Sequence, residues 1–268
     1  MEGKTHQISD KRKVKLVIYE VEDVNEDISL QEIVKTKIGK AVIKYDTPNS
    51  TAIYLNASER ELKAAKALHK ALIEPKLKTQ ESYDLSNEDA SKLYDYFEHI
   101  KMSIIMAYTA VECLSNALIP YNYSYTEQGK DGNRMWDFKE IQRWKSTTQK
   151  LRQILPRALN MNDPGKFKSY STFCKLENLR NEIIHTRSIL PKEVKEEDRL
   201  EYQLLQPRVF NLVASAKSLI KEFHAALPYM PEMPMLYETE SIDKIKIKSW
   251  SDLAVTRTGE WNNDSKEQ

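Results

Sequence analysis

The chain has 268 residues, which is long enough for one large domain with a substantial buried core. Charged residues make up 30% of it and hydrophobic residues 40%, and the glycine count of 6 favours long helices over a turn-rich sheet fold. Lysine and arginine total 41 against 40 aspartates and glutamates, which excludes an overall field that draws the chain to nucleic acid or to a membrane. An RNA partner would have to be met through one local patch.

The two cysteines and the polar N-terminus indicate a cytoplasmic protein. Cys113 and Cys174 lie in helical patterns without the spacing of a zinc site or the number needed for a disulfide scaffold. Residues Met1 to Asp10 lack the apolar stretch of a signal peptide, and no apolar run approaches the roughly 20 residues needed to cross a bilayer. Glycine-rich phosphate loops and the HExxH and GxSxG patterns are also missing, so we expect no cofactor, no metal site and no membrane partner.

Residues 1–57 are predicted to form a β-rich segment. The runs Lys13–Glu20, Ala41–Tyr45 and Ala52–Leu55 are rich in β-branched, aromatic and other apolar residues, as strands are. The turn signal Thr47–Ser50 divides the last two runs. Because three short strands alone are only marginally stable, we expect this sheet to pack against the helices that follow.

Residues 58–227 are predicted to be helical, since apolar residues recur there at three- and four-residue spacing. Ser58 with Glu61 has the form of a capping box, and Ser86 with Asp89 predicts the start of a long helix that ends before Pro120. The other expected elements are a tyrosine-bearing loop over Tyr121–Asn133, a helix over Phe138–Leu155, a turn at Asn162–Gly165, a helix over Phe167–Leu190, a charged connector over Lys192–Arg199 and a helix over Pro207–Leu227.

Residues 228–268 are predicted to be a proline-rich linker, a short strand and a disordered tail. Three prolines between Leu227 and Pro234 forbid a helix there. Ile245 and Ile247 alternate with lysines, the pattern of a half-exposed edge strand whose charges resist further pairing. We expect this strand to lie beside the N-terminal strands and the tail to cover Glu260–Gln268.

His185 differs from the other four histidines in its neighbours. His6 is in a polar tail, and His69, His99 and His224 stand singly in helical patterns among charged residues. We expect those three to be surface or boundary residues, because an isolated imidazole without partners is rarely functional.

Arg180, Asn181 and His185 can act together. Asn181 and His185 are four residues apart on the expected helix, so the amide can hydrogen-bond the imidazole, and Arg180 brings a permanently charged forked donor to the same region. Ile183 and Leu179 would face the core and hold the polar residues on a rigid element. An imidazole that moves a proton beside a guanidinium that neutralises a phosphorane is sufficient for RNA cleavage, since the RNA 2′-OH supplies the nucleophile without a metal.

The segment Arg180-Asn181-Glu182-Ile183-Ile184-His185 resembles the R-N-x-x-x-H form of the Arg-x(4–6)-His motif of the HEPN superfamily. Members of that superfamily are helical bundles, and many are metal-independent ribonucleases of toxin–antitoxin, abortive-infection and CRISPR systems. The order of elements is similar too: a long helix containing Ala107–Ile119, a connecting helix, the motif late in a further helix and a closing helix. The resemblance covers about Ser58 to Leu227.

The resemblance implies a mainly α fold, a HEPN-like helical bundle, here with a small flanking β-sheet from the N- and C-terminal segments. It implies an endoribonuclease that leaves 2′,3′-cyclic phosphate and 5′-OH ends and acts as a defence or toxin effector. His185 would be the general acid or base, Arg180 would stabilise the pentacoordinate phosphate, and Asn181 would orient the imidazole. Enzymes of this kind place two motifs face to face, so one motif per chain implies a homodimer with a composite site. An antitoxin or defence-system partner is a further expectation.

Two other interpretations of the motif stay open. Arg180 can instead pair with Glu177 one turn back, with Asn181 solvated and the His185 cation favoured by the helix dipole. Alternatively, a related bundle can use the same residues as a non-catalytic nucleotide-binding or protein-interaction module.

Glu112 and a tyrosine cluster are the remaining candidates. Glu112 lies on a more polar stripe of its helix, and resembling proteins often carry an acidic residue there that faces the motif; a solvated or helix-pairing role is the alternative. Packing of the loop is likewise the alternative to RNA binding for the cluster. The residues of the cluster that are expected to bind RNA are Tyr121, Tyr123, Tyr125 and Arg134.

Overall fold

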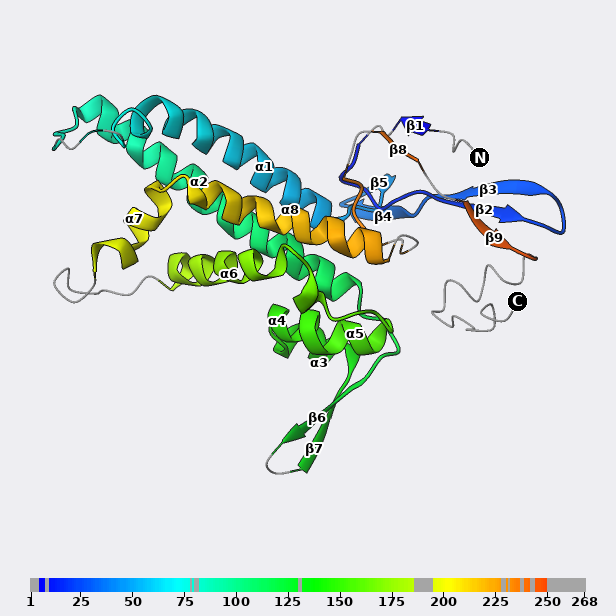
Figure 1. Cartoon of the computed structure of the whole chain (residues 1–268). Coiled ribbons are helices and arrows are strands. Elements are labelled where there is room, and N and C mark those ends of the chain that lie inside the picture. Colours follow the sequence, from blue (N-terminus) through cyan, green and yellow to red (C-terminus); the bar gives the residue numbers. More distant parts are fainter. Residues whose placement is uncertain are drawn as a thin grey trace. The chain divides into compact units, whose positions relative to one another are not determined.

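The protein is mainly helical, with small sheets of two or three strands (Figure 1). The computed structural model describes residues 5–7, 10–77, 79, 82–129, 132–185, 195–227, 230, 232–236, 239–241 and 244–249. The chain divides into two compact units. The helical unit consists of Ile53–Cys113 and Pro164–Phe223, and the mixed unit consists of Met1–Ala52, Leu114–Asp163 and His224–Gln268.

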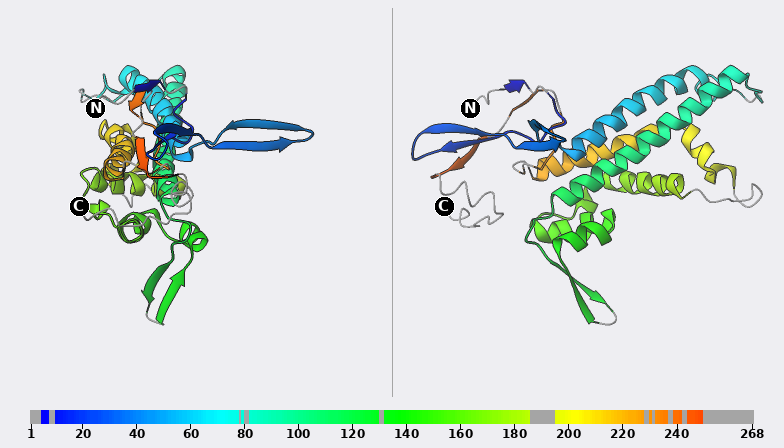
Figure 2. Two further views of the ribbon diagram at one scale, coloured as in Figure 1. Left: turned by 90° about the vertical axis from the view of Figure 1, so that its right-hand side faces the viewer. Right: turned by 180° about the vertical axis from the view of Figure 1, so that it is seen from behind.

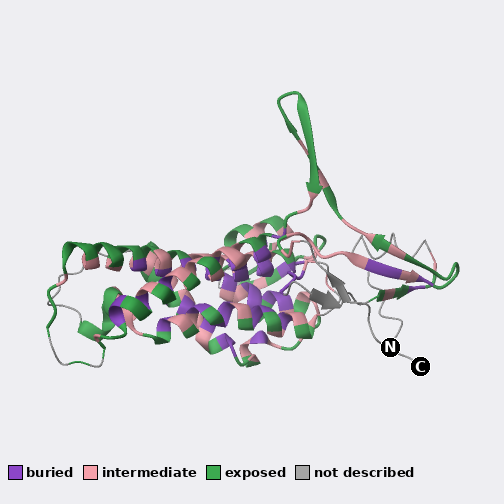
Figure 3. Cartoon of the chain, turned by 90° about the horizontal axis from the view of Figure 1, so that it is seen from above, coloured by how far each residue is buried: buried purple, intermediate pink, exposed green. Residues whose placement is uncertain are grey.

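The helical unit is built from long amphipathic helices. Figure 3 shows their buried residues as stripes along the helices, with exposed residues on the outside. The largest fully buried side chains of this unit include Tyr96, Ile100, Ile104, Phe173 and Phe223. Its helices are α1 (Ser50–Leu68, continued by the π-turn His69–Ile73), α2 (Asn87–Ala117), α6 (Tyr170–Ile184), α7 (Leu200–Leu205) and α8 (Arg208–Ala226).

Buried polar groups tie these helices together in pairs. Ser58 on α1 and Ser103 on α2 each donate a hydroxyl hydrogen bond of 2.9 Å to the other residue's backbone carbonyl. His69 contacts the carbonyl oxygen of Leu205 at 2.9 Å, and the Tyr96 hydroxyl donates to the carbonyl of Leu204. Because each group finds a partner, these polar atoms specify which helices meet without a desolvation penalty.

The mixed unit contains a three-stranded sheet made by both chain ends. β2 (Val17–Val21) pairs antiparallel with β3 (Glu26–Leu30) and parallel with β9 (Lys244–Ile247), in the order β3-β2-β9. Ile247 is buried with Tyr19 and Val21 in a small cluster. The prediction of an edge strand around Ile245 beside the N-terminal strands is therefore confirmed. β1 (Thr5–Gln7) pairs antiparallel with β8 (Thr239–Ser241), which also joins the two chain ends.

Two hairpins and a group of short helices complete the mixed unit. β4 (Ile33–Ile38) and β5 (Ala41–Asp46) form an antiparallel ribbon. β6 (Tyr125–Gly129) and β7 (Gly132–Trp136) form a second hairpin. The short helices are α3 (Phe138–Trp144), α4 (Thr147–Gln149), the π-turn Lys150–Ile154 and α5 (Leu155–Ala158). The 3-10 turn Pro164–Lys166 follows them and opens the second part of the helical unit.

The predicted strand over Ala52–Leu55 is wrong, because this segment is the start of α1. The Asn49 side chain accepts the N–H of Ala52 at 2.9 Å, which caps the helix at the place where a turn between strands was expected. Ala52 and Leu55 are both buried at helical spacing, so tertiary packing overrides their local preference for a strand. Ser58 consequently lies inside the helix and does not cap it.

Other expectations also changed. The loop over Tyr121–Asn133 contains strand β6, and the helix over Phe138–Leu155 is interrupted at Lys145, whose ψ of 136° is extended. His69 is buried, although a boundary position was expected. β3, β4 and α7 had no sequence signal that we recognised, and the described part of the predicted helix over Phe167–Leu190 ends at Ile184.

The predictions for α2 and α8 are confirmed. The N–H of Asp89 donates to the Ser86 hydroxyl at 3.1 Å, as expected for a helix cap, and α8 covers the predicted closing helix. The predicted tail over Glu260–Gln268, most of the connector near Lys192 and part of the proline-rich linker lie outside the described residues.

Candidate functional site

The three motif residues lie at the C-terminal end of α6. Leu179 on the last turns is 2% exposed and anchors this end of the helix in the core. Arg180 is half-buried, whereas Asn181 and His185 are exposed. His185 caps the helix with φ −108° and ψ 51°, and its N–H still donates to the Asn181 carbonyl at 2.9 Å. The imidazole is therefore accessible at a position that the core fixes.

Arg180 rests on the ring of Tyr108 from α2. The guanidinium carbon lies 4.8 Å from the ring centre, and Nη1 donates to Asn181 Oδ1 at 3.0 Å. The Arg180 Nε atom is buried without a hydrogen-bond partner among the described residues. Such a donor costs free energy unless a ligand or water satisfies it, so the guanidinium keeps hydrogen-bonding capacity to offer.

Tyr108 is itself held firmly. It is 6% exposed, its ring is stacked parallel to Phe173 at 5.9 Å, and its hydroxyl donates to Glu177 Oε1 at 3.1 Å. Glu177, which the alternative interpretation pairs with Arg180, thus accepts from Tyr108. Tyr108 could not be assigned to the site from the sequence, because a tyrosine on a helix gives no indication of which residue of another helix packs on its ring.

The side chain of Asn181 has a different partner from the one expected. The expected hydrogen bond to the imidazole assumed an unbroken helix through His185. Since the helix ends at Ile184, His185 leaves helical geometry, and the side-chain oxygen Oδ1 of Asn181 accepts from Arg180 Nη1. In this arrangement Asn181 orients the guanidinium.

Glu112 lies on α2, one helical turn after Tyr108, and is half-buried. Residues four apart share a helix face, which places Glu112 on the stripe that carries the Arg180 contact. Its charge adds to the effect of burial, which raises the pKa of the neighbouring Cys113 thiol. A role for Glu112 in orienting Arg180 or His185 stays a prediction.

The expected RNA-binding residues belong to the mixed unit, in and before the β6–β7 hairpin. Tyr121 is 80% exposed, with its ring tilted against Phe138, whereas Tyr125 is 4% exposed and its hydroxyl donates to Gln153 at 3.0 Å. Tyr123 is half-buried, and burial raises the pKa of its hydroxyl. Tyr121 and the exposed Arg134 are therefore the members of this set that present most surface to solvent.

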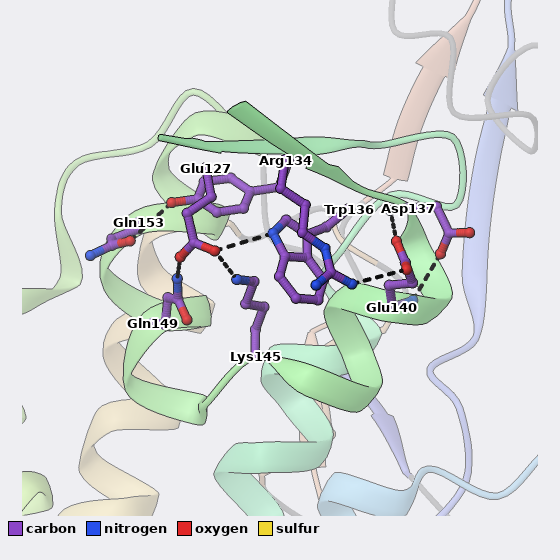
Figure 4. A network of polar contacts seen from close by, with 9 residues as sticks. Glu127, Arg134, Trp136, Asp137, Glu140, Lys145, Gln149 and Gln153 are labelled. Carbon is purple, nitrogen blue, oxygen red and sulfur yellow. Dashed lines mark hydrogen bonds and ion pairs between the residues drawn. The ribbon is translucent and has the colours of Figure 1, made fainter. Parts of the chain in front are cut away.

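Glu127 on β6 is the centre of a polar network (Figure 4). Its carboxylate accepts from Trp136 Nε1 at 3.2 Å and from Gln149 Nε2 at 2.7 Å, and it forms an ion pair with Lys145. The Lys145 ammonium and the Arg134 guanidinium both lie 3.6 Å from the centre of the Trp136 ring. The network joins the hairpin to α3 and α4, and sequence reasoning missed it because the hairpin itself was not foreseen.

The described residues contain no group of three or more His, Cys, Asp or Glu side chains placed to hold a metal ion. In the same part of the chain, every helix is too short or too polar to cross a membrane. Comparisons with protein-family models, with curated proteins and with solved structures gave no match to this chain.

Proposed function

We propose that the protein is an endoribonuclease that uses Arg180 and His185 at the end of α6. The observation that carries this proposal is the set of contacts that holds the Arg180 side chain. Tyr108 and Asn181 hold the guanidinium in place, and an exposed imidazole lies five residues further on. The buried Nε of Arg180 has no hydrogen-bond partner among the described residues. A positioned planar cation and a proton-transfer group at the same end of one helix are the kinds of group that phosphodiester cleavage needs.

The reaction follows from these groups. The RNA 2′-oxygen attacks the adjacent phosphorus while its proton passes to a base, and the bond from phosphorus to the 5′-oxygen breaks as that oxygen receives a proton. His185 acts as base or acid, and Arg180 stabilises the charge on the phosphorane oxygens. The products carry a 2′,3′-cyclic phosphate and a 5′-OH. Because the RNA supplies the nucleophile and the protein supplies the positive charge, the mechanism works without a metal.

One motif per chain supplies one Arg180 and one His185, whereas the base and the acid of this reaction act on opposite sides of the phosphorus. We therefore propose a homodimer in which the motifs of two copies form one composite site. Cleavage of cellular RNA by such a site is toxic, which fits a role as a defence or toxin effector restrained by an antitoxin.

The test is cleavage of a labelled RNA by the purified full chain and by three variants. His185→Ala should lower the rate by about 10²–10⁴, as expected for a lost general acid or base. Arg180→Lys should be severely impaired, since a point charge does not reproduce the planar fork. Asn178→Ala, which changes an exposed residue one turn away on the same helix, is the matched control and should cut normally.

Melting temperatures separate catalysis from folding in this experiment. His185 is exposed, so its removal should change the free energy of unfolding by no more than about 0.5–1 kcal/mol. A His185→Ala protein that folds normally and still cuts RNA at the wild-type rate would falsify the proposal. RNA or nucleotide binding without cleavage by the wild type would favour the non-catalytic binding module.

A further inference from the structure

The β4–β5 ribbon sorts its side chains by charge. Its register places Lys35 directly opposite Lys44 and Lys37 opposite Val42, and opposed residues share a face of the pair. We call this side of the ribbon, which carries Lys35, Lys37 and Lys44 beside Ile33, Val42 and Asp46, with Lys40 at the turn, the basic face. The other face carries Val34, Thr36, Ile38, Ala41, Ile43 and Tyr45. The left panel of Figure 2 shows the ribbon along its length, in blue, and Figure 3 shows it as mainly exposed.

The four lysines of the basic face are exposed, and none of them forms an ion pair within the described part of the chain. Asp46, the acidic residue at the base of the ribbon, pairs with Lys13 at 2.7 Å. Like charges directly opposite each other destabilise a strand pair. The ribbon thus concentrates uncompensated positive charge in a chain whose formal net charge is +1.

We propose that the basic face binds the phosphate backbone of RNA and is the local patch through which this nearly neutral chain meets its substrate. The proposal rests on the proposed ribonuclease function for the identity of the polyanion. Lys35 and Lys37 are two residues apart on one strand, about 7 Å, so their flexible stems reach successive phosphates. A phosphate placed between Lys35 and Lys44 also removes the repulsion across the ribbon.

The size of the ribbon argues against a second copy of the chain as the occupant. Six paired residues span about 20 Å and two strands about 10 Å, so one face offers about 200 Å². A stable protein interface takes about 800 Å² from each partner. Electrostatic binding to a polyanion has no such requirement, because each neutralised phosphate releases counterions and contributes by itself.

The experiment measures binding of the full chain to a labelled, fully 2′-O-methylated RNA by fluorescence anisotropy over a range of salt concentrations. This RNA lacks the attacking hydroxyl, so binding is read without cleavage. Lys35→Gln/Lys44→Gln should bind about tenfold more weakly or worse, and the slope of log K against log salt should fall by about 1.4, which is 0.7 for each lost contact to a single strand. The matched control Lys63→Gln/Lys70→Gln changes two exposed lysines, one on α1 and one on the π-turn that continues it, and should bind within about twofold of wild type.

Each outcome decides the matter. Equal weakening in both double variants would show that net charge alone matters, and wild-type binding by the ribbon variant would show that the ribbon does not contact RNA. Either result overturns the proposal. The proposal is also overturned if the ribbon variant keeps RNA binding but no longer binds anionic vesicles, which would indicate a membrane surface as the partner. It is likewise overturned if the variant keeps RNA binding but has the mass of a single chain in light scattering, which would indicate a dimer interface. If RNA binding depends on the ribbon but the chain does not cleave unmodified RNA, RNA binding by the basic face is supported and the proposed ribonuclease activity is ruled out.

Discussion

Arg180 on α6 lies over the ring of Tyr108 on α2, with the guanidinium carbon 4.8 Å from the ring centre. Tyr108 is fixed from behind by Phe173 and at its hydroxyl by Glu177, so the position of the guanidinium depends on two helices at once. An arginine that is oriented before RNA arrives gives up less rotamer freedom on binding phosphate. This contact therefore links packing of the helical unit to the proposed chemistry.

Two substitutions of Tyr108 distinguish the contribution of its ring from that of its hydroxyl. Tyr108→Phe keeps the surface under Arg180 and removes one hydrogen bond, at a cost of about 0.5–1.5 kcal/mol in the free energy of unfolding. Tyr108→Leu also removes the cation–π contact, about 0.5–2 kcal/mol, and frees the guanidinium. We expect cleavage to be nearly normal in the first variant and strongly reduced in the second, measured as rate per folded protein after denaturant titration. Equal cleavage by both variants would show that Tyr108 does not position Arg180.

Asn181 offers a second test of the same arrangement. Its Oδ1 accepts from Arg180 at 3.0 Å, whereas Asn178 lies one turn earlier, also exposed. Either change to alanine should alter stability by no more than about 0.5 kcal/mol. Only Asn181→Ala should slow cleavage, with kcat and KM both affected because the phosphate is held less accurately. If the two variants have the same kinetic constants, Asn181 is a solvated surface residue.

The helices and the sheet could be foreseen where the signal was local. Ser86 caps α2 because its hydroxyl acts on the next turn, and β9 carries alternating lysines whether or not its partner strand is known. The strand prediction for Ala52–Leu55 was wrong because burial against parts of the chain distant in sequence decides the conformation of this segment. The placement of the lysines on one face of the β4–β5 ribbon depends on the pairing register of its strands. A slip of one residue would move the side chains of a strand to the opposite face.

In the candidate site, too, the residues with a local sequence signal could be predicted and those that depend on tertiary packing could not. Arg180 and His185 stand out by residue type and spacing, so the sequence alone could nominate them. Tyr108 is 72 residues from Arg180 along the chain, and its role depends on how α2 packs against α6. The partner of Asn181 depends on where α6 ends, and helix ends are the least predictable part of an element.

Chelation should leave the activity intact. In the proposed reaction the RNA 2′-OH attacks and Arg180 carries the stabilising charge, so no step passes through a divalent ion. RNA cleavage should proceed at the same rate with and without EDTA, and the 3′ ends should be cyclic phosphates by mass spectrometry. Loss of cleavage in EDTA, with recovery on adding a divalent ion, would contradict this mechanism.

Leu179 and Ile183 should differ in their contribution to stability. Leu179 is 2% exposed and fully in the core, whereas Ile183, which the sequence also placed on the core face, is half-buried. Leu179→Ala should cost about 2–5 kcal/mol and Ile183→Ala distinctly less, since the cost follows the cavity left behind. Urea titration of both variants measures the difference, and cleavage per folded molecule should stay near wild type in each. The interpretation of α6 fails if Ile183→Ala is the more damaging change.

The Glu127 network predicts a pH dependence of stability. Hydrogen bonds from Lys145 and then Gln149 hold the pKa of Glu127 below its ordinary value of 4.5. A carboxyl whose pKa is lowered by folding stabilises the folded state above its ordinary pKa, and this contribution is lost as the pH falls through the folded value. Wild type should therefore lose more free energy of unfolding than Glu127→Gln between neutral pH and about pH 3. Guanidinium titrations of both proteins over this range are the measurement. Glu140→Gln is the control on α3: its ion pair with Arg134 is longer, at 3.6 Å, and a glutamine can still accept the hydrogen bond that Asp137 N–H donates at 3.1 Å. This variant should follow the wild-type curve more closely. A Glu127→Gln curve parallel to wild type would show that this carboxylate contributes no charge-dependent stability.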